Sequence, residues 1–224
     1  MNDLELNIYF VAFIDILGFS SMVSHDCERA SSEKKFLTKL NAIHNETKSL
    51  SDTIPGIDVK QFSDSIVLST PYSKDTVLFQ EFVEVVCKYQ YHLLMKGILC
   101  RGGISYGKHF SNKDFIFSNG LIDAYRIEST IARNPRIIVS NELIELFPLI
   151  VEHHMLAREH DGYYFLNYLL ANTAAENWDL IKAVVPNKMV ENSSIREKHI
   201  WLLELYNKLY PNSIVRLTER FTFS

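Results

Sequence analysis

The clearest hydrophobic pattern in the chain is an almost continuous apolar run at residues 8–16, IYFVAFIDI. A run of this length, rich in β-branched and aromatic residues, predicts a central strand buried on both faces. Residues 57–70 predict two short strands around Ser63 and Asp64, which would form a β-hairpin with the acid at its tip. Further strands are predicted by three shorter segments: 97–107, 136–139 and 163–166.

Segments with apolar residues at helical spacing lie between these strands and after them. The stretch that follows Gly18 predicts a helix to about Leu50, interrupted near Ser31, and Ser140 is a good N-cap for a short helix. Pro55 and Gly56 predict a turn. The remaining predicted helices are 75–96, 119–133, 176–188 and 194–209.

The order of these elements, β-α-β-β-α-β followed by helices, predicts an α+β fold. We expect a mainly antiparallel sheet with helices on one face and a C-terminal helical appendage. No stretch is rich enough in Gly, Ser or Pro to separate two domains. We therefore expect one domain over 1–172, with the extension 173–224 packed on it.

The composition limits the classes of function. The 224 residues are 47% hydrophobic and 22% charged, as in a protein with a sizeable core, and the net charge of −4 argues against a nucleic-acid partner. The three cysteines are widely spaced, which favours neither disulfides nor zinc and fits a reducing cytoplasm. Residues 1–7 do not resemble a signal peptide, and the run at 8–17 is too short to span a bilayer.

Two aspartates carry the candidate chemistry. Asp15 lies inside the apolar run, where an ionised carboxylate is costly unless it is paired, hydrogen-bonded or bound to metal. Asp15 could instead cap the helix that follows, and Asp64 could be an ordinary turn residue. If the strand and the hairpin are neighbours, however, both carboxylates would lie at one end of the sheet, an arrangement suited to two hard cations.

Several segments resemble, in order and spacing, the motifs of class III adenylate and guanylate cyclases. Residues 13–20 (FIDILGFS) resemble the first metal motif, and residues 59–64 (VKQFSD) resemble the second. Three later blocks resemble the strand and helix motifs that follow: 101–107 (RGGISYG), 126–130 (RIEST) and 136–140 (RIIVS). The resemblance covers about residues 8–166 and implies a palm-like, ferredoxin-type sheet.

The resemblance implies a role for each matched residue. Asp15 and Asp64 would bind two divalent cations, Mn²⁺ or Mg²⁺, with the Ile16 carbonyl as a further ligand. Arg126 would stabilise charge on the α-phosphate as a catalytic residue, and Lys60 would contact the base. The triphosphate would be bound by a backbone turn and an arginine: Leu17, Gly18, Phe19, Ser20 and Arg101.

The resemblance also implies a homodimer with composite active sites, in which Arg126 of one chain serves the metals of the other. The substrate would be a nucleoside triphosphate, and the product a 3′,5′-cyclic monophosphate plus pyrophosphate.

The chain departs from the purine cyclases at three places. Ile122 stands where they have an asparagine that orients the ribose, and Phe115 lies near the place of the acid that pairs with the base-reading lysine. The late strand, 160–166, offers no lysine for the phosphates.

Three segments are similar to the compact bacterial cyclases of the Pycsar anti-phage systems: 124–129 (AYRIES), 132–139 (ARNPRIIV) and 161–167 (DGYYFLN). That similarity implies a pyrimidine substrate and a product, cyclic UMP or cyclic CMP, that acts on a separate effector. UTP is favoured over CTP because no clear acid is available to read a cytosine amino group.

Other readings remain open. A non-catalytic cyclase-like module that binds nucleotide and dimerises would explain the missing asparagine, and a purine cyclase is a further alternative. A diguanylate cyclase or polymerase ranks lower because no paired acids follow Arg101-Gly102-Gly103. A structural protein that binds a partner through its helical tail would use Trp201 and Leu203, but docking of that helix on its own domain explains them equally well.

Overall fold

The computed structural model describes residues 4–28, 34–51, 56–152, 154–170, 172–186 and 190–215. The predicted helix interruption near Ser31 and the predicted turn residue Pro55 lie outside these residues. Gly56 has a φ of +80°, as a turn glycine often has.

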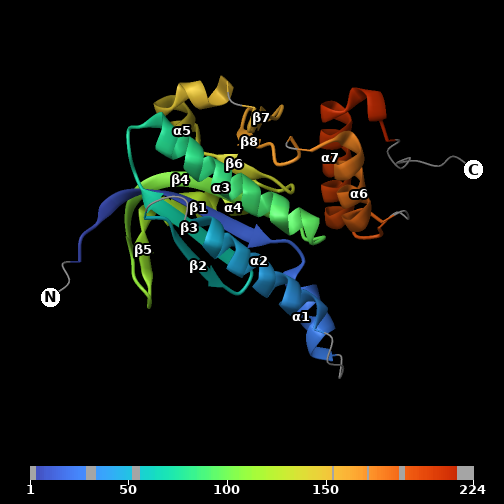
Figure 1. Cartoon of the computed structure of the whole chain (residues 1–224), viewed down its shortest axis with the longest axis horizontal. Helices are drawn as coiled ribbons and strands as arrows, with labels where there is room; N and C mark the ends of the chain where they lie inside the picture. Colours follow the sequence, from blue (N-terminus) through green and yellow to red (C-terminus); the bar gives the residue numbers. More distant parts are fainter. Residues whose placement is uncertain are drawn as a thin grey trace, which may run out of the picture.

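An eight-stranded sheet forms the centre of the structure (Figure 1). Its strand order is β2-β3-β1-β4-β6-β8-β7, with β5 paired to β4. All neighbours are antiparallel except β4 and β6. The strands are β1 (Asn7–Ile16), β2 (Asp58–Phe62), β3 (Ser65–Pro71), β4 (Cys100–Ser111), β5 (Ile116–Ser118), β6 (Ile137–Val139), β7 (Leu156–Arg158) and β8 (Tyr164–Leu166).

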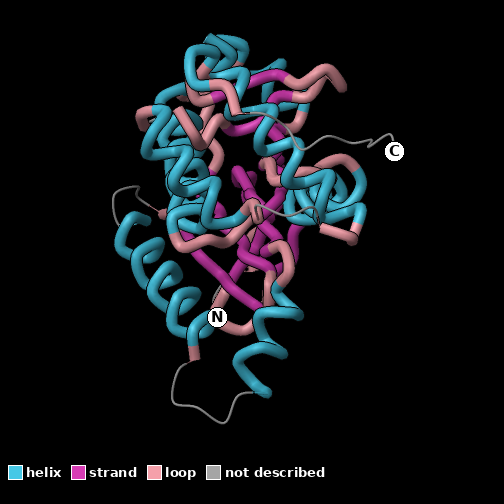
Figure 2. The backbone as a smooth tube through the Cα atoms, turned by 90° about the vertical axis from the view of Figure 1, so that its right-hand side faces the viewer, coloured by secondary structure: helices cyan, strands magenta, loops and turns pink. Residues whose placement is uncertain are grey.

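Helices lie on both sides of the strands (Figure 2). The helices are α1 (Phe19–Glu28), α2 (Lys35–Ser51), α3 (Thr76–Met95), α4 (Asn119–Thr130), α5 (Asn141–Leu146), α6 (Ala174–Val184) and α7 (Ser193–Leu209), with 3₁₀ turns at Pro148–Glu152 and Pro211–Ser213. In the described residues, no helix combines the length and apolar character that crossing a membrane requires.

The α+β fold class predicted from the sequence is confirmed, but the placement of all helices on one face is wrong for α4. Phe10, Ala12 and Ile14 of β1 pack in one cluster with α3. Val11 and Phe13 pack on the opposite face with Ala124 of α4. The alternation of side chains along a strand makes β1 apolar on both faces, so each face needs a covering helix.

The two C-terminal helices pack on the same body as the sheet. Trp201, Leu202 and Tyr206 of α7 share a cluster with Ile138 of β6 and Phe165 of β8. Figure 1 shows α6 and α7 side by side at one end of the sheet. The domain boundary at residue 172 stays a prediction.

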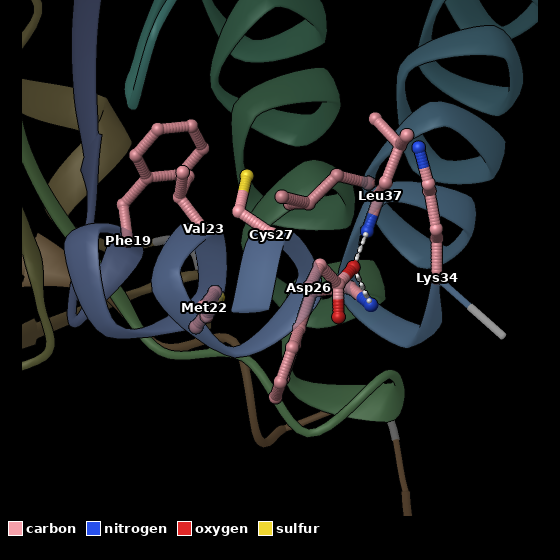
Figure 3. Close-up of a pocket in the computed structure, with 9 residues that line it drawn as sticks. Phe19, Met22, Val23, Asp26, Cys27, Lys34 and Leu37 are labelled. Atoms are coloured by element: carbon pink, nitrogen blue, oxygen red, sulfur yellow. Dashed lines mark hydrogen bonds between the residues drawn. The ribbon is translucent and has the colours of Figure 1, made fainter. Parts of the chain in front are cut away.

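Asp26 ties the first two helices together (Figure 3). Its carboxylate accepts hydrogen bonds from the backbone N–H groups of Phe36 and Leu37, each at 2.8 Å. The bond from Leu37 is the main reason that the pKa of Asp26 lies below its ordinary value. These N–H groups belong to the first turn of α2, which has no intrahelical acceptor for them. The two helices enclose a mostly apolar cavity of about 380 Å³.

Close contact between α4 and β4 depends on Gly103. A Cβ atom at this position would lie 2.4 Å from the Ala124 carbonyl oxygen and 2.7 Å from Cβ of Ile127. Both contacts are with rigid parts of α4, so the helix would have to move away from the sheet.

We predict that Gly103→Ala destabilises the chain by about 1–3 kcal/mol, the usual cost of overpacking a core. Chemical denaturation compared with Ser129→Ala, at an exposed position of the same helix, measures this. Equal stability of the two variants would contradict the assigned helix–sheet contact.

Candidate active site

The end of β1 is fixed by backbone pairing on both sides. Asp15 is opposite Ser65 of β3 and opposite Arg101 of β4. The N–H of Ile16 donates to the carbonyl of Asp64 at 3.0 Å, and the N–H of Leu17 donates to a carbonyl just before β4 at 2.8 Å. Asp15 and Asp64 therefore meet at one end of the sheet, as the sequence predicted.

The hairpin tip is held in a tight turn. Ser63 has a φ of 57°, in the left-handed region that favours glycine. The turn places Asp64 directly before β3, where the residue is half-buried. Proximity of Asp64 is one of the causes that raise the pKa of Asp15, after burial of the carboxyl group.

Arg101 connects two acids from different elements. Its Nε lies 3.4 Å from Oδ2 of Asp15, and its Nη2 lies 2.7 Å from Oε1 of Glu128 on α4. The Glu128 side chain is only 3% exposed. The predicted phosphate-binding arginine is thus engaged by two carboxylates.

Glu128 was not among the sequence predictions for the site. Its pKa is raised to about 7. Burial is the main cause, Arg101 opposes it, and the charges of Asp15 and Asp64 add to it. The one sequence feature that could have pointed to Glu128 is its position within the RIEST block, two residues after Arg126. Nothing in the sequence indicates that this position faces β4.

These residues fit divalent cations. Asp15 and Glu128 share the guanidinium of Arg101. Burial is the main cause that raises the pKa values of both acids, and repulsion from the charge of Asp64 raises them further. A cation bound between Asp15 and Asp64 would relieve that repulsion. In the described part of the chain, no three or more His, Cys, Asp or Glu side chains are grouped to hold a metal by themselves. The Ile16 carbonyl and oxygens of a bound substrate would have to complete the coordination.

The turn from Leu17 to Ser20 leads from β1 into α1. Gly18 has a φ of +77°, and α1 begins at Phe19 without an acid in its first turn. The N–H groups at this helix start are suited to an anion. The turn therefore adjoins both the carboxylates and an anion-binding element.

Arg126 lies apart from this cluster. It is 70% exposed and pairs with Asp123 at 3.1 Å. It lines a cavity of about 450 Å³, together with Asn119, Asp123 and Glu142. Within the described residues it forms no ion pair with Asp15 or Asp64. One chain therefore does not bring Arg126 to its own carboxylates.

Lys60 forms an ion pair with Asp58, with Nζ 3.4 Å from Oδ1. Asp58 also accepts a hydrogen bond from the hydroxyl of Ser111 at 2.7 Å. An acid is thus available beside the predicted base-contacting lysine. Lys60 is on the rim of a cavity of about 570 Å³ that also includes Phe19 and Ser63.

The raised pKa of Glu128 predicts a pH dependence of stability. Between the ordinary value of 4.5 and about 7, the folded chain holds a proton that the unfolded chain releases. Stability should therefore fall as the pH rises through this range. We expect melting temperatures measured in EDTA to fall less steeply with pH in Glu128→Gln than in the unaltered chain. Glu145→Gln, at an exposed position, serves as the control, and identical slopes in all three proteins would contradict the prediction.

Comparison with known proteins identifies the fold. No family model matches the sequence, and no curated protein matches it. Solved structures do match: the adenylyl cyclase CyaB from P. aeruginosa has a TM-score of 0.52 at 18% identity, covering 72% of this chain and 94% of that one.

Two further structures are similar. A non-canonical dimeric guanylyl cyclase domain of the RhoGC fusion protein from the aquatic fungus Blastocladiella emersonii has a TM-score of 0.52 at 14% identity, covering 71% of this chain and 93% of that one. The catalytic core of a rhodopsin–guanylyl cyclase with converted specificity, in complex with ATPαS, has a TM-score of 0.51 at 15% identity, covering 72% and 96%. The chain has the class III cyclase fold.

Proposed function

We propose that the chain is a nucleotide cyclase that converts a nucleoside triphosphate to the 3′,5′-cyclic monophosphate and pyrophosphate. One observation carries the proposal: within a cyclase fold, Asp15 and Asp64 meet at the end of β1, directly before a turn that leads into a helix start. Two carboxylates beside an anion-binding turn are suited to a metal-bound triphosphate.

Each residue has a part in the proposed mechanism. Asp15, Asp64 and the Ile16 carbonyl would hold two divalent cations, Mn²⁺ or Mg²⁺. Such cations lower the pKa of a ribose 3′-hydroxyl and hold the triphosphate. The turn at 17–20 would donate backbone N–H groups to phosphate oxygens, and Arg101 would neutralise their charge. The 3′-hydroxyl would lose its proton to solvent and its oxygen would attack the α-phosphorus in line, while the bond from that phosphorus to the bridging oxygen of the β-phosphate breaks and pyrophosphate leaves. Positioning and electrostatics carry such a step without a dedicated general base.

A second copy of the chain would complete the site. Arg126 is exposed and pairs with Asp123 of its own helix, which supports its use as a catalytic residue for a partner's α-phosphate in a homodimer. Ile122 stands where the purine cyclases have the asparagine that orients the ribose. Asn119 lines the same cavity as Arg126, so it is available for that role instead.

For the base we propose a pyrimidine, on the resemblance to the Pycsar cyclases and on Phe115 at the place of an acid. Lys60 would contact the base. UTP was favoured because the sequence shows no clear acid to read a cytosine amino group. Asp58, however, lies beside Lys60 and could serve as such an acid. UTP and CTP therefore both remain candidates, and the product would signal in anti-phage defence through a separate effector.

A non-catalytic nucleotide-binding module is the second candidate. The ion pairs of Arg101 with Asp15 and Glu128 favour it, because a guanidinium already held by carboxylates is less available to phosphates.

The direct test is turnover. Purified chain incubated separately with ATP, GTP, CTP and UTP plus Mn²⁺ should yield a cyclic pyrimidine monophosphate, identified by mass spectrometry. Asp64→Ala should lose at least about 100-fold in rate because it loses a metal ligand. Mn²⁺ should also raise the melting temperature of the unaltered chain and not that of Asp64→Ala. No product from any of the four nucleotides would favour the non-catalytic module, and a cyclic purine product would overturn the proposed base.

Complementation tests the composite site. Asp64→Ala and Arg126→Ala should each be inactive alone. Mixed in equal amounts and allowed to exchange, they should recover about a quarter of the unaltered activity, since half the dimers would carry one intact site. A control mixture combines Asp64→Ala with Arg133→Ala, a substitution of an arginine just after α4. Arg133→Ala should remain active by itself. Failure of the two inactive variants to complement would exclude a site shared between chains.

A further inference from the structure

The C-terminal helix α7 packs in one cluster with Ile127 of α4, the helix that covers the face of the sheet on which Arg101 meets Glu128. Alternate residues along a strand share a face, so Leu99 and Arg101 point to the same side as Gly103, which contacts α4. Leu99 packs in the same cluster as Trp201 and Leu202 of α7. Helix α7 therefore passes along the side on which Arg101 meets the end of β1.

A cavity of about 390 Å³ separates α7 from the turn that follows β1. Leu17 and Gly18 line it from the turn, and Lys198 and His199 line it from α7. Most of the remaining lining is aliphatic, so the polar groups in this wall are few. Two basic side chains of α7 thus share a cavity with the turn proposed to bind the triphosphate.

The Lys198 ammonium group is hydrogen-bonded within its own helix. Its Nζ donates to the carbonyl of Ser194 at 3.1 Å and to the hydroxyl of the same residue at 2.8 Å. Among the residues that the structure describes, it forms no ion pair with a carboxylate. Burial lowers its pKa, and the nearby charge of Arg101 lowers it further. Two cations that approach each other repel, and an anion bound between them would relieve that repulsion.

We propose that Lys198 is a phosphate-binding residue, through which α7 completes the triphosphate site formed by the turn at 17–20 and Arg101. The late strand at 160–166 offers no lysine for the phosphates, and Lys198 would take that role. It belongs to a helix outside residues 8–166, the segment that resembles the cyclases. The ligand it recognises is a polyphosphate, either the triphosphate of a nucleotide or free pyrophosphate. This proposal rests on the proposed location of the triphosphate, but it does not require turnover.

Binding of inorganic pyrophosphate with Mg²⁺, measured by isothermal titration calorimetry, tests the proposal without catalysis. Lys198→Met keeps the apolar stem and removes the charge. It should bind about 10- to 100-fold more weakly than the unaltered chain, the usual effect of losing a hydrogen bond to a charged group. Lys198→Arg should retain most of the affinity. Lys208→Met, at an exposed position of the same helix, should bind as the unaltered chain does.

The outcomes separate this proposal from the proposed activity. Equal affinity of Lys198→Met and the unaltered chain, or no pyrophosphate binding by the unaltered chain, would overturn the role of Lys198, even if cyclic nucleotide is formed. Lys198-dependent binding without any cyclic product would uphold this role and reject the cyclase. If Lys198→Met does not fold, loss of binding in Lys198→Gln with an unchanged melting temperature would support the role, and unchanged binding in that variant would overturn it.

Discussion

Charge balance at the end of β1 is the constraint on which the site depends. The carboxylates of Asp15 and Glu128 pair with the guanidinium of Arg101, and the charge of Asp64 acts on both acids. Burial raises the pKa of Asp15 and that of Glu128, the charge of Asp64 raises both further, and Arg101 offsets only part of this effect. A folded chain that keeps buried carboxylates in this state has a local need for positive charge. Divalent cations are the natural way to meet it, which connects the energetics of the fold to the proposed chemistry.

Helix α4 serves two surfaces at once. Glu128 and Arg126 are two residues apart, so they point in directions that differ by about 200° around the helix. Glu128 is buried against Arg101, whereas Arg126 is largely exposed. The close approach of α4 to the sheet at Gly103 fixes both directions together. The same helix can therefore organise the carboxylates of its own chain and present an arginine to a second chain.

The C-terminal helices are anchored in a way that gives α7 a defined position. Trp201 packs against Phe165 with ring centroids 5.5 Å apart, and its Nε1 donates to Glu159 at 3.0 Å. Glu159 in turn pairs at 2.5 Å with the buried Arg136. This network joins α7 to the loop before β8 and to the start of β6. A helix held this firmly can position Lys198 one turn earlier.

The sequence by itself determined the strand at 8–16, the hairpin with Asp64 at its tip and the fold class, because each is encoded in local periodicity and turn chemistry. It also indicated Asp15 as a candidate metal ligand, since a carboxylate within an apolar run is conspicuous. Only the tertiary structure decided which face α4 covers, that Glu128 meets Arg101, and that Lys198 shares a cavity with Gly18. These contacts join residues that are far apart along the chain. Helical periodicity shows that a residue belongs to a face, but packing alone decides what that face meets.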